Sequence, residues 1–105
     1  MANNLPRKVV RNLEIMGEQI KLARKRRGLS IAVMSERAQC SELTVIRAEK
    51  GIPTVSIGVY ARILYGLGLD EDLLLVAQND SAGNAFINAR LLRKNEKKED
   101  YNVFD

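Results

Sequence analysis

The stretch LSIAVMSERAQCSELTVIRAEKG, residues 29–51, decides the fold of this chain. Ser30 and Ser41 each precede a short helix-forming run, at the position where a serine side chain caps the free N–H groups of a helix. Only two residues separate the runs, so the turn between them is tight. The stretch therefore predicts two short helices, 31–38 and 41–50, held at a fixed angle.

The second of these helices has one face that is not expected to pack into the core. At 100° per residue, small apolar side chains gather on one side and a mixed set gathers on the other. The inward residues are Val45 and Ala48, and the outward residues are Leu43, Ile46, Arg47 and Lys50. Exposed aliphatic groups suit thymine methyls in a DNA major groove, and an arginine suits guanine. The alternative is that the two aliphatic residues pack on a neighbouring helix and the arginine is a solvated charge.

Three further helices are expected around this pair. The first spans about 12–27 and stops at Gly28, the fourth begins after a cap at Ser56, and the fifth spans about 70–77. Apolar spacings of three and four residues predict the remaining core positions: Leu13, Met16, Ile20, Ala23, Met34, Ala38, Ile57, Tyr60, Ile63, Leu64 and Leu67. The predicted fold class is all-α, a compact five-helix bundle with a C-terminal extension.

Composition divides the chain into three parts. Residues 1–11 are expected to form a basic arm in which Pro6 opposes an early helix, 12–77 to form the folded domain, and 78–105 to form a linker and charged tail. Residues 1–77 carry 12 basic and 8 acidic side chains, whereas the remainder carries 5 of each. The positive excess therefore lies in the folded part, as expected for a protein with a polyanionic partner.

Several functional classes are disfavoured by what the sequence lacks. Histidine is absent, which removes the commonest acid–base catalyst and metal ligand, and no other catalytic cluster is seen. Cys40 is the single cysteine, so no intramolecular disulfide can form. No apolar run approaches the roughly 20 residues of a membrane span. We expect a cytoplasmic protein that is not an enzyme and that uses no metal or cofactor.

The two-helix stretch resembles the helix-turn-helix of the phage repressor and Cro family, also called the XRE family, and the resemblance extends over about residues 13–77. It implies base-edge contacts from the positions of Glu42, Leu43 and Arg47. It also implies positions close to phosphates or the groove wall for Ile31, Ser41 and Thr44. The sequence departs from many members at Ile31, where they have glutamine, and at Glu42, where they have a basic or neutral polar residue. Glu42 can accept a bond from cytosine or can repel non-specific phosphate.

Additional contacts to the DNA backbone are predicted outside the recognition face. Lys50 is the best candidate for a phosphate, and Thr54 with the helix start at Ser56 can offer hydroxyl and N–H groups, although ordinary capping explains them equally well. The basic residues near the N-terminus can follow the DNA backbone or can simply be solvated; they are Arg7, Lys8 and Arg11.

Arg24 and Glu49 form a second match to the phage repressors, in which an arginine of the first helix pairs with a glutamate near the end of the third. Arg24 lies beside the core stripe, and Glu49 lies toward the inward side of its helix. We expect a partly buried ion pair that holds the recognition helix in place. The alternative is two unrelated surface charges.

Four consecutive apolar residues in the fifth helix exceed what one core-facing stripe uses; they are Leu73, Leu74, Leu75 and Val76. The surplus favours a two-fold homodimer contact, and dimeric helix-turn-helix proteins read inverted repeats of double-stranded DNA. The alternative is that Phe86 and Ile87 of the protein's own tail cover these residues.

Within the family, GLSIAVMSERA and TVSIGVYARILYGLGL look most similar to HipB-like antitoxin regulators, whose basic extension is comparable with residues 89–98. This resemblance implies an autoregulating repressor that also binds a HipA-like kinase toxin. The alternatives are a stand-alone regulator of the same family without a toxin, and an interaction protein whose helix-turn-helix has lost DNA binding.

Overall fold

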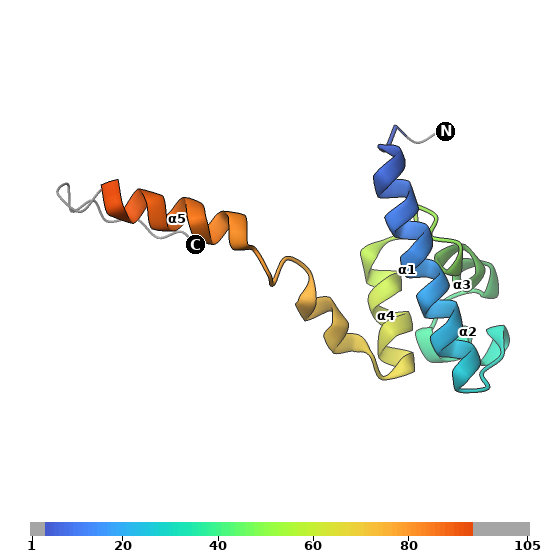
Figure 1. Ribbon diagram of the computed structural model, residues 1–105. Helices are drawn as coiled ribbons and strands as arrows, with labels where there is room; N and C mark the ends of the chain where they lie inside the picture. The colour runs from blue at the N-terminus through green and yellow to red at the C-terminus, as the bar shows by residue number, and fades with distance from the viewer. Residues whose placement is uncertain (1–3, 94–105) are drawn as a thin grey trace. The chain divides into compact units, whose positions relative to one another are not determined.

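The computed structural model describes residues 4–93, which form helices and turns with no strand among them. The elements in chain order are α1 (Arg7–Arg26), α2 (Ile31–Ala38), α3 (Glu42–Glu49), α4 (Ile57–Leu67), the 3-10 helix η1 (Asp70–Leu75) and α5 (Ser81–Arg93) (Figure 1). The predicted all-α bundle is confirmed. The chain divides into two compact units, Met1–Leu73 and Leu74–Asp105. No helix in the described part is long and apolar enough to cross a membrane.

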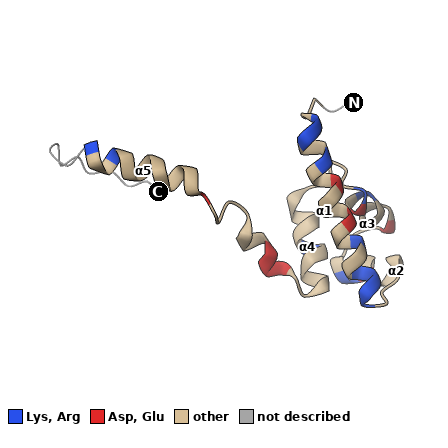
Figure 2. Cartoon of the chain, viewed as in Figure 1, with Lys and Arg blue, Asp and Glu red and all other residues tan. Residues whose placement is uncertain are grey.

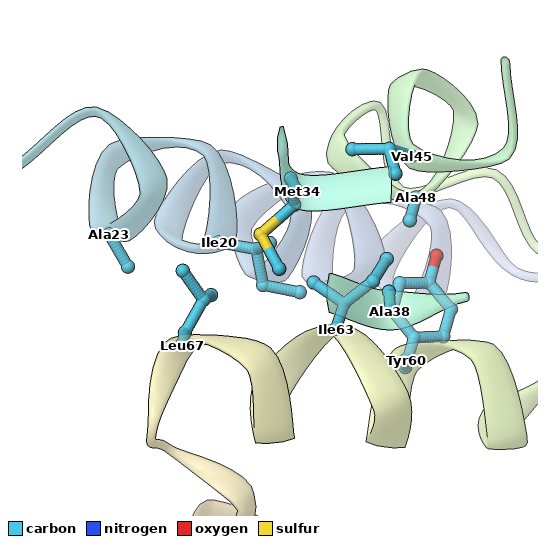
Figure 3. Close-up of a cluster of buried hydrophobic side chains, with 9 residues drawn as sticks. All are labelled: Ile20, Ala23, Met34, Ala38, Val45, Ala48, Tyr60, Ile63 and Leu67. Carbon is cyan, nitrogen blue, oxygen red and sulfur yellow. The ribbon is translucent and has the colours of Figure 1, made fainter. Parts of the chain in front are cut away.

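The first unit encloses a core to which all four of its α-helices contribute (Figure 3). Met34, Val45 and Ile63 are its largest fully buried side chains. The complete set of buried apolar residues is Ile20, Ala23, Met34, Ala38, Val45, Ala48, Tyr60, Ile63 and Leu67. Every one of them occupies a predicted inward position, so the helical periodicity located the core correctly.

Ile57 is the exception among the predicted core residues, because its side chain is 71% exposed. It is the first residue of α4, and side chains in an α-helix point toward the helix N-terminus. The Ile57 side chain therefore extends past the start of α4 and does not reach the core.

Serine side chains begin three of the helices, as predicted. The Oγ atoms of Ser30, Ser41 and Ser56 each accept a hydrogen bond from the backbone N–H three residues later, at 3.1, 3.0 and 3.1 Å. Each bond satisfies a donor that has no partner inside its helix, which fixes where that helix starts.

The first helix begins earlier than expected. Pro6 is the residue directly before α1, and its carbonyl accepts bonds from the N–H groups of Val9 and Val10 at 3.0 and 3.1 Å. Proline is tolerated at a helix start because the first N–H groups are unpaired in any case. Residues 7–11 are therefore helical and not an extended arm; residues 1–3 of the predicted arm lie outside the described part.

The turn between α2 and α3 depends on a left-handed residue. Gln39 has φ = 54° and follows the last residue of α2. Its N–H donates to the carbonyl of Glu36, and the N–H of Cys40 donates to that of Ser35, at 3.2 and 3.1 Å. This conformation costs a residue with a side chain about 1–2 kcal/mol, and it turns the chain directly into α3.

The C-terminal elements differ from the sequence-based expectation in two respects. The predicted α-helix over 70–77 is the shorter 3-10 helix η1, and Ala77 after it has φ = 62°. None of its residues is buried, so no packed face favours a longer α-helix. The predicted linker contains the start of α5, because Asp80 Oδ1 accepts a bond from the N–H of Gly83 at 2.9 Å and caps the helix. Residues 94–105 of the predicted tail lie outside the described part.

Candidate nucleic-acid interface

The outward side of α3 is exposed in the isolated chain, as the sequence predicted. Leu43 is 53% exposed and Ile46 is 37% exposed. Arg47 and Lys50 are exposed beside them, whereas Val45 on the opposite side is completely buried. Neither aliphatic side chain is buried, and Leu43 is the more exposed of the two. An exposed strip of two aliphatic and two basic side chains therefore lies on a helix that the core holds from behind.

Two glycines let the end of α3 approach α1 closely. A Cβ atom added to Gly17 would lie 2.6 Å from the carbonyl oxygen of Glu49 and 2.7 Å from the nitrogen of Gly51. A Cβ on Gly51 would in turn meet the backbone of Leu13, and Gly51 has φ = 72°. Backbone thus packs directly on backbone at this point. The contact at Gly17 was not predicted from the sequence; the available signal was a glycine within a helical pattern, which costs stability unless packing requires it.

Arg24 and Glu49 form a buried, two-pronged ion pair between α1 and α3. Arg24 Nε donates to Glu49 Oε2 at 2.6 Å, and Arg24 Nη2 donates to Oε1 at 3.0 Å. The third arm of the guanidinium, Nη1, donates to the carbonyl of Leu29 at 2.9 Å. The hydrogen bond to Glu49 raises the pKa of Arg24 above its usual value, against the opposing effect of burial. One arginine therefore connects α1, the loop before α2 and the end of α3.

An open groove of about 910 Å³ runs beside the exposed strip, between α1, the start of α2 and α3. Ile46 and Lys50 line it from α3, and Lys21 and Lys25 line it from α1. The positive residues of α1 lie toward its two ends, with acidic residues between them (Figure 2). The spacing of Lys21 and Lys25 along α1 is equally typical of a solvated helix face, so the sequence did not predict that they line this groove. Their neighbour Arg24 was the available signal, because its pairing with Glu49 turns this part of α1 toward α3.

The hydroxyl groups near the recognition face are already engaged in caps. Ser41 Oγ lies 2.8 Å from Thr44 Oγ1 and also accepts the Thr44 N–H. One of the two hydroxyl protons is used in the bond between these oxygens, so one remains for another acceptor. Ser56 Oγ accepts the Val59 N–H and keeps its own proton, and Thr54 is exposed nearby in the chain.

The two positions at which the sequence departs from the XRE pattern have different environments. Ile31 is half-buried and packs against the core, so at most part of its side chain faces outward. Glu42 is exposed in the first turn of α3, where the helix dipole stabilises a negative charge. The position of Glu42 therefore stabilises α3.

The apolar residues proposed for dimerisation are mostly uncovered. Leu74, Leu75 and Val76 are 71%, 61% and 73% exposed, and Leu73 is half-buried. Phe86, which the alternative would place over them, is 71% exposed. In residues 4–93 no group of three or more His, Cys, Asp or Glu side chains is arranged to hold a metal ion.

The model of a protein family described as a helix-turn-helix domain matches residues 15–76. The matched segment is more than half of the chain, which therefore belongs to this family. No curated protein and no solved structure gives a significant match. The family supports a DNA-binding regulator, and such domains are typically not enzymes.

Proposed function

We propose that this member of the helix-turn-helix family is a sequence-specific transcriptional repressor that inserts α3 into the major groove of double-stranded DNA. The observation that carries the proposal is the two-sided character of α3, exposed at Leu43 and Arg47 and completely buried at Val45 and Ala48. Its 8 residues span about 12 Å at 1.5 Å each, a length similar to the width of the groove.

The side chains of the exposed strip can contact the edges of base pairs. Arg47 can donate two parallel hydrogen bonds to O6 and N7 of a guanine. Leu43 and Ile46 offer apolar surface to the methyl groups of thymines beside it, and Lys50 offers a charge to phosphate. Glu42 can accept from the amino group of a cytosine. The strip thus favours a site in which a guanine has thymine neighbours.

Groups on either side of the strip are proposed to hold the DNA backbone. The free hydroxyl proton of the Ser41–Thr44 pair and the N-terminus of α4 at Ser56, with Thr54 before it, can bind phosphate oxygens. Lys21 and Lys25 line the groove beside α3 and add positive charge on that side. Such contacts fix the register of the protein on the duplex but carry no sequence information.

The Arg24–Glu49 pair is proposed to hold α3, and with it the exposed strip, in position. Both side chains are almost fully buried, at 9% and 5% exposed, and the pair is bidentate. The ion pair attaches the last residue of α3 to α1, so α3 cannot rotate without breaking the pair.

A two-fold dimer is proposed to read an inverted repeat, with the apolar residues at 73–76, of which 74–76 are exposed, in the contact. Two copies of α3 placed one DNA turn apart, about 34–36 Å, would bind two half-sites. Occupation of a promoter by such a dimer blocks transcription.

Selection of bound duplexes from a random library, followed by binding measurements, tests the proposal. We expect Arg47→Ala to weaken binding to the selected site by roughly 1–3 kcal/mol and to relax the preference at one base pair. Arg26→Ala is the matched control, because Arg26 is an exposed arginine of α1 that does not line the groove. Equal losses on selected and random duplexes would show that Arg47 contacts only phosphate. Failure to enrich any sequence would instead favour the interaction protein without DNA binding, which Glu42 supports by placing a negative charge at the start of α3.

We further propose that the chain is the autoregulating antitoxin of an operon with a HipA-like kinase toxin. The support is the resemblance of residues 28–38 and 54–69 to HipB-like regulators, together with the exposed side chains of Phe86, Leu91 and Leu92 in the described part of the extension. A growth assay with the adjacent kinase-like gene expressed alone and together with this protein tests the role. Absence of such a gene, or growth arrest that this protein does not relieve, leaves the stand-alone regulator.

A further inference from the structure

The bundle has a second charged feature, on α2 and α4, that the proposed DNA contacts do not use. A shallow hollow of about 300 Å³ is lined by Arg37, Gln39, Ala61, Arg62 and Tyr65. None of these residues lines the groove beside α3. Tyr65 is 71% exposed, and both arginines are exposed. The hollow thus combines an accessible aromatic ring with two positive charges.

Backbone carbonyls hold the two arginines in place. Arg37 of α2 donates from Nη1 to the carbonyl of Gly66 at 3.2 Å, and Arg62 of α4 donates from Nε to the carbonyl of Ala38 at 2.9 Å. Each guanidinium thereby reaches across to the other helix and keeps most of its five N–H donors for other partners. The ion pairs found among residues 4–93 are Arg11–Glu14 and Arg24–Glu49, so neither arginine of the hollow has a carboxylate partner there.

The charges that would complement this hollow occur in the same unit of the chain. Asp70, Glu71 and Asp72 are consecutive and exposed in the first turn of η1, and none of them has an ion pair among residues 4–93 (Figure 2). They begin four residues after Gly66, whose carbonyl binds Arg37, yet they do not pair with the arginines of their own chain. The exposed apolar residues at 74–76 follow immediately.

We propose that a second copy of this chain docks here, with the acidic turn of each copy on the Arg37–Arg62 pair of the other. In a two-fold dimer a contact between two different patches forms twice, so one acidic turn and one arginine pair per chain are sufficient. Tyr65, which lines the hollow, supplies the uncharged part of the same interface. The inference rests on the proposed function only in taking the DNA-bound form to be a dimer, for which it assigns the charged contacts.

A second copy fits these observations better than DNA does. The three carboxylates lie next in sequence to the end of α4 that carries the hollow and would repel a phosphate backbone, whereas they are the complement that a second copy needs. Charge complementarity of this kind also sets orientation, because a rotated dimer would bring like charges together.

Charge reversal in the full chain, without DNA, tests the interface by sedimentation equilibrium at low ionic strength. We expect Arg37→Glu with Arg62→Glu to raise the dimer Kd at least about tenfold, and Asp70→Lys with Asp72→Lys to do the same, because several ion pairs are replaced by repulsion. The variant with all four changes restores the pairs in the opposite sense and should return to within about threefold of wild type. Arg26→Glu with Arg27→Glu is the control for the arginine pair, because it makes the same change in net charge at exposed residues that line neither the hollow nor the groove beside α3.

Several outcomes would overturn the inference: a wild-type chain that stays monomeric, unchanged dimerisation in both double variants, or a fourfold variant as weak as either double variant. Circular dichroism checks that each variant is folded. If the glutamate pair unfolds the bundle, Arg37→Gln with Arg62→Gln removes the two charges without introducing a carboxylate beside the carbonyls of Gly66 and Ala38. DNA binding is measured separately on a single half-site. If the protein dimerises but does not bind DNA, the proposed function alone is contradicted. If the protein binds DNA but the fourfold variant does not recover dimerisation, this inference alone is contradicted.

Discussion

The bundle and the segment that follows it contain similar apolar side chains in very different environments. Nine apolar residues of the bundle are 4% exposed or less. In residues 74–93, by contrast, six large apolar residues are between 55% and 73% exposed: Leu74, Leu75, Val76, Phe86, Leu91 and Leu92. Apolar composition therefore did not decide burial. The apolar residues of the bundle are buried because its helices pack against one another.

The contrast also bears on stability. Two of the α-helices of the bundle have only 8 residues, and helices of that length depend on tertiary packing. The helix α5 has 13 residues and none of them is buried. An isolated helix of that length is only marginally stable in water. We therefore expect the bundle to unfold as one cooperative unit and α5 to gain its stability from a partner.

The largest effect is expected from Glu49→Ala, which should reduce the free energy of unfolding of the bundle by about 3–5 kcal/mol because it leaves Arg24 buried without its counter-charge. Chemical denaturation measures the loss. Glu14→Ala is the matched control, since it removes the exposed Arg11–Glu14 pair at 3.7 Å and should cost less than about 1 kcal/mol. Similar losses in the two variants would show that the buried Arg24–Glu49 pair contributes no more to the free energy of unfolding than the exposed Arg11–Glu14 pair.

The next effect is expected from Gly17→Ala, which puts a Cβ within 2.6 to 2.8 Å of three backbone atoms at the end of α3. The bundle should lose about 1–3 kcal/mol, because backbone cannot move aside as a flexible side chain can. Gly28→Ala provides the comparison: Gly28 has φ = 67° but nothing lies within 4 Å of its added Cβ, so only conformational strain of about 1 kcal/mol is expected. A stabilised Gly17→Ala variant would contradict the close approach of α1 and α3.

A gain is expected from Gln39→Gly. Because Gln39 adopts φ = 54°, glycine should relieve strain in the turn and raise the free energy of unfolding by up to about 1 kcal/mol. The increase should appear in the denaturation midpoint without a change in slope. A loss of stability would mean that the entropy of glycine in the unfolded chain outweighs the strain.

The smallest effect is expected from Phe86→Ala in α5, and it compares the two regions directly. Unfolding of the bundle should change by less than about 0.5 kcal/mol, since Phe86 is 71% exposed. Ile63→Ala, at a completely buried position, should cost about 2–5 kcal/mol. A large effect of Phe86→Ala at low protein concentration would show that α5 packs on its own bundle.

Much of the fold and the exposed face of α3 could be predicted because the signals are local. Serine caps act over three residues, and the core stripe repeats every three or four, so both can be recognised in the chain without any tertiary contact. The start of α1 and the type of η1 were predicted wrongly for a related reason. A proline can stand directly before a helix or interrupt one, and an apolar run can form an α-helix or a shorter 3-10 helix, so the surrounding structure decides in both cases.

The sequence by itself determined the all-helical character, the nine core positions and the orientation of the recognition face, because these follow from backbone hydrogen bonding and from 100° per residue. Only the tertiary structure decided that Gly17 is a point of backbone contact and that Lys21 and Lys25 line the groove beside α3. These features depend on how helices separated by 25 or more residues pack against one another, and no local pattern in the chain encodes that geometry.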